Sequence, residues 1–299
     1  MDDVPTSLAD ASGSPAALAE ALASTGYLAD TGLATVGFLG VRLERPIFLE
    51  GEAGAGKTAF AAALAQVRGV ELIRLQCYEG LDVSQALYDW DFARQILHLR
   101  TAEAAHAADP GQGLYDRRFL LARPLLRALE SAPCVLLVDE IDRADDEFEA
   151  YLLELLGEWA VTIPEIGRVV ARTPPTVVLT SNRTRDVHDA LKRRCLYHWV
   201  AHPDPQREAA ILRLRLPAVH ARLTEQVARA TAALRTLDLV KPPGIAEAID
   251  WTRALDALGA DEVTVPLAEV TLGAALKVRE DIDRVRGRLP ALVSEGFDG

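Results

Sequence analysis

Residues 51–58 read Gly-Glu-Ala-Gly-Ala-Gly-Lys-Thr, the complete phosphate-binding pattern G-x-x-x-x-G-K-[ST]. The apolar run before it reads as a strand, and the alanine-rich segment after it reads as a helix. Glycines let the backbone approach a phosphate closely, and the amides at a helix N-terminus favour its negative charge. Lys57 can reach the β- and γ-phosphates, and the Thr58 hydroxyl can bind magnesium. The pattern predicts a nucleoside triphosphate site formed by Gly51, Glu52, Ala53, Gly54, Ala55, Gly56, Lys57 and Thr58.

Composition and charge narrow the class of protein. The 299 residues are 49% apolar and 25% charged, as in a globular protein, and no apolar run reaches the roughly 18 to 20 residues of a transmembrane helix. The acidic start lacks the features of a signal peptide. Cys77, Cys134 and Cys195 are odd in number, far apart and without metal-ligand spacing, so we expect free thiols and a cytoplasmic location. The net charge of −12 argues against a nucleic-acid partner.

The order of apolar segments predicts an α/β fold. Continuous apolar runs separated by helical segments indicate a parallel sheet covered on both faces. These runs are 46–49, 71–76, 134–138 and 176–180, with a helix before them at 28–39 and a short run after them at 197–200. The rest reads almost wholly as helix, at 207–216, 219–237, 245–258 and 267–288. We predict a flexible tail at 1–22, a nucleotide-binding domain at 23–203 and a small helical domain at 204–299.

An acidic pair follows the third apolar run. Val135 to Val138 lead into Asp139 and Glu140, which is the Walker B pattern. Because ligands of a doubly wound sheet sit outside the carboxyl ends of its strands, we expect both carboxylates near the phosphate loop. Asp139 would then share the magnesium shell with Thr58, and Glu140 would orient or deprotonate the attacking water. Without the loop upstream, such a pair is equally compatible with the start of a solvated helix.

Two further features are candidates for catalysis. Asn182 follows the next strand, where its amide can lie between the γ-phosphate and the water, although a lone Asn there is more often a turn former. Arg193 and Arg194 end a predicted helix before the last strand. They either complement a helix C-terminus or supply an arginine finger, a guanidinium offered to the γ-phosphate of a neighbouring subunit. We favour the finger and leave the choice between the two arginines open.

Taken together, these motifs resemble those of AAA+ ATPases, and the helical second half resembles the AAA+ lid. More narrowly, the chain resembles the MoxR branch, and within it the CoxD-like accessory ATPases of carbon monoxide dehydrogenase maturation. The stretches that carry this narrower likeness are 48–54, 74–82 and 161–167, and the likeness as a whole covers about residue 25 to the end. One departure is the segment 240–247, which has no arginine where many MoxR-type lids carry one, so that either Lys241 or Arg253 replaces it or the contact is absent.

The resemblance implies ATP and Mg²⁺ as cofactors and ATP hydrolysis as the activity. It also implies a homo-oligomer, typically a hexameric ring, with a von Willebrand factor A domain partner. The client would be a metalloenzyme, such as a molybdenum hydroxylase of the carbon monoxide dehydrogenase type. The ATPase would remodel this client mechanically and would not itself carry the client's metal. Three alternatives stay open. They are an activator of Rubisco or of nitric oxide reductase, a nucleotide-gated scaffold with little turnover, and a nucleic-acid motor, which the acidic charge disfavours.

Two segments match inserted elements of the same branch. Residues 159–171 alternate around Pro164 to Gly167, which predicts a β-hairpin before the Asn182 strand. Residues 88–119 are too long for a simple link and predict an insertion in the second helix. Four aromatic side chains of this region could grip a polypeptide, although packing on the sheet is the preferred interpretation for each alone. They are Tyr78, Tyr88, Trp90 and Tyr115.

Overall fold

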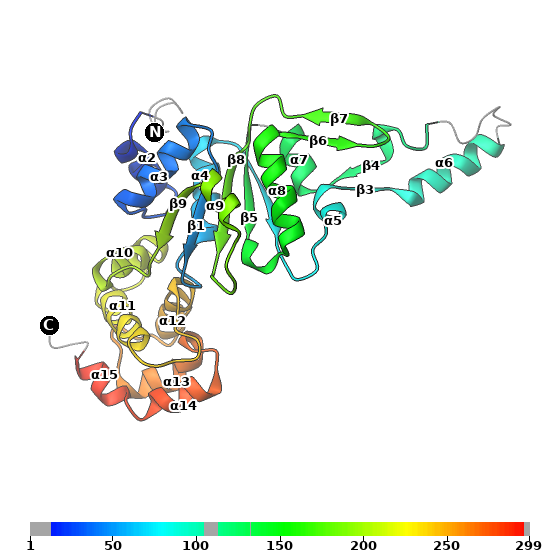
Figure 1. Ribbon diagram of the computed structural model, residues 1–299. Coiled ribbons are helices and arrows are strands. Elements are labelled where there is room, and N and C mark those ends of the chain that lie inside the picture. The colour runs from blue at the N-terminus through cyan, green and yellow to red at the C-terminus, as the bar shows by residue number, and fades with distance from the viewer. Residues whose placement is uncertain (1–12, 105–112, 132, 296–299) are drawn as a thin grey trace, which may run out of the picture. The chain divides into compact units, whose positions relative to one another are not determined.

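The computed structural model describes residues 13–104, 113–131 and 133–295 (Figure 1). The chain divides into two compact units. The first contains Met1–Ala21, Ala29–Glu50 and Thr58–Trp199, and the second contains Leu22–Leu28, Gly51–Lys57 and Val200–Gly299. The change of unit at Val200 lies close to the boundary predicted near residue 203. The phosphate loop and residues 22–28 group with the helical unit, which the sequence did not indicate.

A five-stranded sheet with the order β2-β5-β8-β1-β9 forms the centre of the first unit. The pairs β1–β8, β5–β8 and β2–β5 are parallel, as predicted, with Leu49 opposite Thr180 and Gln76 opposite Asp139. The carboxyl ends of these four strands therefore share one edge of the sheet. The strands are β1 (Ile47–Gly51), β2 (Glu71–Gln76), β5 (Cys134–Asp139), β8 (Thr176–Ser181) and β9 (Leu196–Val200).

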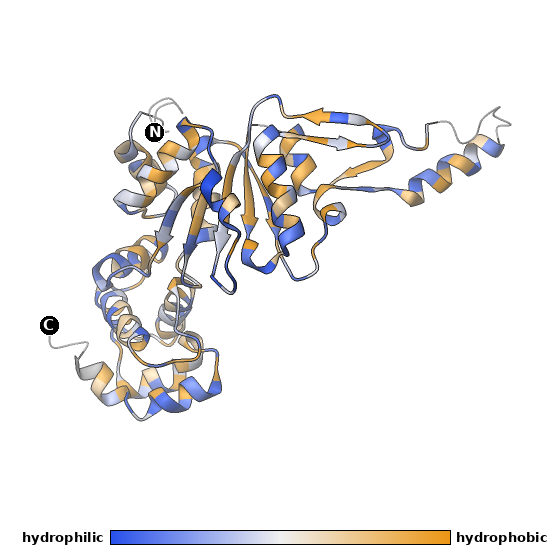
Figure 2. Ribbon diagram, viewed as in Figure 1, coloured by the Kyte–Doolittle hydropathy of each residue, from blue (hydrophilic) through white to orange (hydrophobic). Residues whose placement is uncertain are grey.

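Alternate residues of the buried strands pack on opposite faces of the sheet. Phe48 and Leu136 belong to one apolar cluster with Phe148 of α8. On the other face, Ile47 lies against Gly40 of α3, where a Cβ would come within 2.4 Å of the Ile47 side chain. Figure 2 shows the apolar residues concentrated on β5, β8 and the helices beside them. The predicted three-layer αβα arrangement is therefore confirmed. Its helices are α2 (Pro15–Ser24), α3 (Thr31–Arg42), α4 (Lys57–Arg68), α5 (Val83–Leu87), α7 (Pro124–Glu130), α8 (Asp146–Glu158) and α9 (Asp189–Arg194).

Two small antiparallel sheets extend this unit. Strand β3 (Tyr88–Trp90) pairs with β4 (Leu120–Ala122), and between them lie α6 (Phe92–Ala104) and the 3-10 turn η1 (Arg117–Phe119). Strand β6 (Ala160–Ile163) pairs with β7 (Gly167–Val170), which confirms the predicted hairpin. Gly167 has φ +99°, a conformation that a glycine adopts readily and that closes the turn.

The second unit packs helices around its own apolar core, with Trp251 fully buried. The helix predicted over 267–288 is wrong, because the chain forms two helices there. Leu276 and Val278 are extended, and the break leaves Leu276 buried in the core. Asp281 lies in the first turn of the next helix, where it accepts bonds from the amides of Val240 and Lys241. The helices are α10 (Pro205–Arg215), α11 (Ala221–Arg235), α12 (Ile245–Ala257), α13 (Val265–Ala275), α14 (Arg279–Arg286) and α15 (Leu289–Glu295).

The predicted tail at 1–22 is wrong in its second part. Residues 15–24 form α2, whose Leu18 and Leu22, one helical turn apart, are both buried. Residues 1–12 lie outside the described part of the chain. Over the described residues, no helix combines the length and the apolar character that crossing a membrane requires. The three cysteines are free and buried, and burial raises the pKa of Cys77 and Cys195 to about 12.

Candidate nucleotide site

The loop 51–57 connects β1 to α4 and has the backbone that its glycines predict. Gly54 and Gly56 have φ of +74° and +95°, where other residues would be strained. A Cβ on Gly51 would lie 2.1 Å from the carbonyl oxygen of Val200. The Lys57 amine is buried and donates hydrogen bonds of 2.7 Å to the carbonyl oxygens of Gly51 and Glu52. The Lys57 ammonium group is thus bound by carbonyl oxygens of its own loop.

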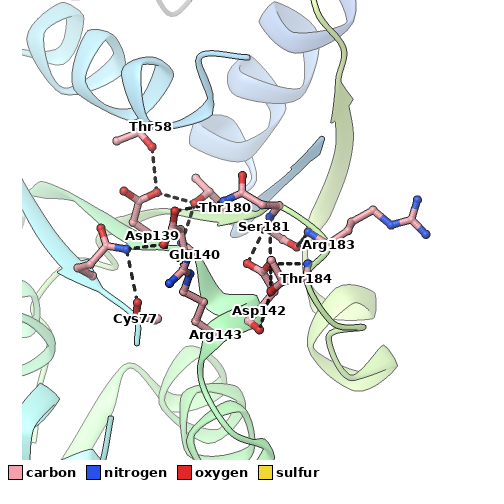
Figure 3. Close-up of polar contacts among 12 residues, drawn as sticks. Thr58, Cys77, Asp139, Glu140, Asp142, Arg143, Thr180, Ser181, Arg183 and Thr184 are labelled. Atoms are coloured by element: carbon pink, nitrogen blue, oxygen red, sulfur yellow. Dashed lines mark hydrogen bonds and ion pairs between the residues drawn. The ribbon is translucent and has the colours of Figure 1, made fainter. Parts of the chain in front are cut away.

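Asp139, at the end of β5, is the centre of the polar group shown in Figure 3. Its Oδ1 accepts a hydrogen bond of 2.9 Å from the Thr58 hydroxyl and one of 2.6 Å from the Thr180 hydroxyl. Its Oδ2 forms an ion pair of 2.5 Å with Arg74 of β2. The side chain is 3% exposed, so these three partners replace the water that an ionised carboxylate otherwise needs. The structure brings Thr58 and Asp139 together, as the sequence predicted.

Glu140 leaves the strand in a left-handed conformation, with φ 55°, and its amide donates to the Thr180 hydroxyl at 2.9 Å. Its carboxylate accepts hydrogen bonds from the Asn182 amide at 3.2 Å and from the Gln76 amide at 3.1 Å. The Arg143 guanidinium lies 3.0 Å from the same carboxylate. Asn182 therefore lies against Glu140, and the two predicted residues share one site.

Asp142 supports the loop that carries Asn182. Its carboxylate is buried and accepts bonds from the backbone amides of Asn182, at 3.2 Å, and Thr184, at 2.8 Å. The Thr184 hydroxyl adds a third bond of 2.8 Å. Figure 3 shows Asp142 facing this loop while Arg183 points away from it. Asp142 fixes the position of the Asn182 side chain through the backbone rather than through direct contact with the side-chain amide.

Sequence reasoning missed several members of this site. Arg74 donates to the Gln76 amide oxygen at 2.6 Å, so β2 links the carboxylates of Asp139 and Glu140. The signal was present in the sequence, because a polar residue ends β2 as Asp139 ends β5. The sequence alone does not show that β2 and β5 are neighbours in the sheet, so the side chains at their ends could not be paired. The missed residues are Arg74, Gln76, Asp142, Arg143 and Thr180.

The two candidate finger arginines lie apart from this group. The Arg194 guanidinium donates to the Leu153 carbonyl of α8 at 2.9 Å. Arg45 donates to the carbonyl oxygens of both arginines and so fixes the end of α9. Arg193 is exposed, and within the described part of the chain no residue pairs with its guanidinium. Neither arginine contacts Asp139 or Glu140.

The segment without the lid arginine lies at the start of α12. The Ile245 amide donates to the Gly54 carbonyl at 3.0 Å, and a Cβ on Gly244 would lie 2.7 Å from the Gly54 Cα. Lys241 is exposed, and Arg253 is exposed and faces Asp250 at 3.9 Å. Neither side chain contacts the phosphate loop in the structure, so their proposed replacement of the lid arginine gains no support here.

An arginine close in sequence, with a side chain only 10% exposed, was not anticipated. Arg235 of α11 binds both carboxylate oxygens of Glu208, at 2.6 and 2.8 Å, and donates to the Pro243 carbonyl. Burial raises the pKa of Glu208, and the bonds from Arg235 oppose that shift. Burial, with the charges of Arg235 and Lys57, lowers the pKa of His202 to about 4, so this imidazole is neutral at pH 7.

Comparisons with known proteins agree with this geometry. Residues 46–195 match the family model of the AAA domain (dynein-related subfamily). A stretch of 47 residues is 43% identical to midasin of Giardia intestinalis and covers 16% of this chain and 1% of midasin. Two structures of Thermotoga maritima RuvB, the Holliday junction branch migration motor and a proline-to-glycine mutant, cover 87% and 84% of this chain and 70% of theirs, at 17% identity and TM-scores of 0.46 and 0.48. At these values the likeness to RuvB adds nothing to the family match.

The matched segment contains the phosphate loop, Asp139, Glu140 and Asn182, and it spans half of the chain. The chain therefore belongs to the AAA domain family of P-loop ATPases, in its dynein-related subfamily.

Proposed function

We propose that this protein hydrolyses ATP. The observation that carries the proposal is the environment of Glu140, whose carboxylate is held by two side-chain amides next to the Thr58–Asp139 pair. Arg143 also lies 3.0 Å from this carboxylate, but the Glu140 side chain is 30% exposed, so a water molecule can still reach it and give it a proton. Glu140 would orient and deprotonate the attacking water, and Asn182 would hold both the carboxylate and the water in line.

The donor set also fits the cofactors that the family implies. The Thr58 hydroxyl and the Asp139 carboxylate are hard oxygen ligands of the kind that Mg²⁺ prefers, and they lie 2.9 Å apart. Mg²⁺ bound there would neutralise charge on the phosphates. The glycine-rich loop presents backbone amides, and the Lys57 ammonium can exchange its two carbonyl partners for phosphate oxygens. Arg74 would have to share Asp139 with the metal ion.

The substitution Glu140→Gln tests this role. It keeps the shape of the side chain and one of its two acceptor oxygens but removes the base, so we expect hydrolysis to fall about 100-fold or more with ATP affinity retained. Phosphate release and fluorescent-nucleotide binding measure the two properties. Glu103→Gln on α6 makes the same change at an exposed position and should leave both unchanged. Normal turnover in Glu140→Gln would overturn the assignment.

We further propose that the ATPase is a MoxR-type remodelling protein that acts on a metalloenzyme in the cytoplasm. The support is the sequence resemblance, the β6–β7 hairpin before β8 and the insertion that carries α6. The buried free thiols fit a reducing compartment. A pull-down of the full chain with a molybdenum hydroxylase and its von Willebrand factor A domain partner tests the client. Capture of a Rubisco or a nitric oxide reductase instead would favour the alternative activator role.

We also propose a homo-oligomeric ring, as a hexamer, and the positions of the arginines on α9 support it. Neither Arg193 nor Arg194 contacts the nucleotide site of its own chain, as a finger that acts on a neighbour requires. The ATPase rate per subunit should rise steeply with protein concentration and then reach a plateau. Mixing Arg193→Ala or Arg194→Ala with Lys57→Ala should restore part of the activity, because an interface with the phosphate loop of the arginine variant and the finger of the Lys57→Ala chain holds an intact site. A rate independent of concentration would contradict the ring.

A further inference from the structure

A pocket of about 750 Å³ lies in the first unit, away from the nucleotide site. Strand β3, helix α8 and the β6–β7 hairpin line it, and Figure 1 shows these elements around one region of the ribbon. Its volume is within the range of about 300 to 1,000 Å³ that small-ligand pockets occupy. The side chains that define its character are Tyr88, Trp90, Tyr151, Glu154 and Glu165.

One residue of the pocket wall has a polar atom without a partner. The Tyr151 hydroxyl is buried, and no described residue forms a hydrogen bond with it. Burial and then the negative charge of Glu154 raise the pKa of Tyr151 to about 12. Burial and the charge of Glu165 raise the pKa of Tyr88. The Tyr151 hydroxyl is therefore protonated at neutral pH, and its lone pairs are unused.

The charges around the pocket are unbalanced. Asp89 pairs with Arg123 at 3.1 Å, and Glu158 pairs with Arg168 at 2.9 Å. Glu154 and Glu165 are exposed, and among the described residues no arginine, lysine or histidine lies within ion-pair distance of either. The pocket therefore carries two carboxylates that this chain leaves without a cation.

Aromatic rings complete the wall. Tyr88 and Trp90 meet edge to face with their centroids 6.1 Å apart, and both pack on the main core of the unit. Trp90 also meets Tyr115 edge to face at 5.2 Å. The face of a tryptophan or tyrosine ring attracts a cation, and a held ring binds it with less loss of conformational freedom. These contacts give Tyr88 and Trp90 a packing role and also fix their position in the pocket.

We propose that this pocket binds the arginine or lysine side chain of a partner polypeptide. The stem of such a side chain fits between apolar walls, and its cation can face Glu154, Glu165 and the aromatic rings. The Tyr151 hydroxyl can accept one N–H bond from it. The acidic rim excludes a nucleic-acid phosphate. A metal ion fits poorly, because no group of three or more His, Cys, Asp and Glu side chains among the described residues is placed to hold one.

The test uses the full chain without nucleotide, so it does not depend on the proposed ATPase activity. The probe is a fluorescent peptide with one arginine between glycine and serine residues, and its partner probe carries citrulline, which has the same shape without the charge. Fluorescence anisotropy should show at least about tenfold weaker binding of the citrulline peptide, because a charged hydrogen bond is lost. Equal binding of both peptides, or no binding of either, would overturn the proposal.

Variants locate the binding. Glu154→Gln combined with Glu165→Gln should weaken the arginine peptide about tenfold and leave the citrulline peptide unchanged. Glu147→Gln, an exposed acid on the same helix, is the matched control and should change neither by more than about twofold. Tyr151→Phe should weaken the arginine peptide about threefold without loss of stability, because its hydroxyl has no partner in the free chain. If the control weakens binding as much as the pair, the cation binds elsewhere.

Discussion

Carboxylates cluster in two places of the first unit, and the two clusters differ in how many partners the same chain supplies. At the edge of the large sheet, Asp139, Glu140 and Asp142 each accept several hydrogen bonds from residues of the same chain. At the pocket beside β3 and α8, Glu154 and Glu165 have no such partners among the described residues. The first group is ordered before any ligand arrives, whereas the second still offers its charge to a ligand.

This difference has a thermodynamic meaning. A buried carboxylate with several donors stabilises the fold, because its removal leaves those donors without partners. A carboxylate without a cation stabilises nothing in the free chain and contributes only when a partner binds. Substitutions should therefore cost stability or catalysis at the sheet edge, and should cost binding but not stability at the pocket.

The largest effect on stability is expected for Asp142→Ala. The change leaves the amides of Asn182 and Thr184 without the buried carboxylate that accepts from them, and it should lower the free energy of unfolding by about 3 kcal/mol. Urea unfolding followed by circular dichroism measures this value. Glu147→Ala, at an exposed site five residues later, is the control and should change stability by no more than about 0.5 kcal/mol. A similarly small loss in Asp142→Ala would show that the loop after β8 does not depend on this carboxylate.

The next effect is catalytic. Asn182→Ala removes one of the two amides that hold the Glu140 carboxylate, so kcat should fall about 30-fold, which corresponds to the loss of one charged hydrogen bond of about 2 kcal/mol. The affinity for ATP, measured with a fluorescent analogue, should stay within about twofold, because this amide has its effect on the water. A loss of affinity with kcat unchanged would move Asn182 from positioning Glu140 to binding the nucleotide.

The sheet edge was largely predictable from the sequence, because two strong signals coincide there. The phosphate loop and the acidic pair after a continuous apolar run fix the fold class, and in a parallel sheet the ends of such runs meet at one edge. The partners of these residues were not predictable. Gln76 meets Glu140 only because β2 lies next to β5, and Arg74 meets Asp139 for the same reason.

The predicted helix boundaries were wrong where the burial of apolar side chains outweighs the local conformational preference of the sequence. The start of the chain is rich in serine and alanine, and only the packing of Leu18 and Leu22 shows that residues 15–24 form a helix. The break between α13 and α14 occurs at Leu276 to Val278, where no proline or glycine marks it. For the aromatic residues of the insertion, the sequence left two interpretations open, packing on the sheet and binding of a polypeptide. The structure shows that Tyr88 and Trp90 pack on the core and also line the pocket.

A smaller effect is expected for Arg74→Ala, which distinguishes metal binding from phosphate binding at the sheet edge. Arg74 occupies one oxygen of Asp139, the proposed metal ligand, and it is half exposed, so its removal should lower the Mg²⁺ concentration for half-maximal nucleotide binding about fivefold. A fluorescent ATP analogue titrated with Mg²⁺ gives this value. Arg127→Ala removes an arginine that pairs with Glu71 at the other end of β2, and it should leave the Mg²⁺ dependence unchanged. A higher Mg²⁺ requirement in Arg74→Ala would mean that this guanidinium helps to bind the phosphates instead.

The smallest expected effect is a gain in stability rather than a loss, and it tests directly whether the pocket carboxylates differ from those at the sheet edge. Glu154→Gln with Glu165→Gln removes two negative charges that no described cation balances, so the free chain should become slightly more stable, by about 0.3 kcal/mol. Urea unfolding at low and at moderate salt should show the gain shrinking as salt screens the repulsion. A loss of more than about 1 kcal/mol would mean that the two carboxylates already support the fold. In that case the pocket would resemble the sheet edge, and its charge would no longer be available to a partner.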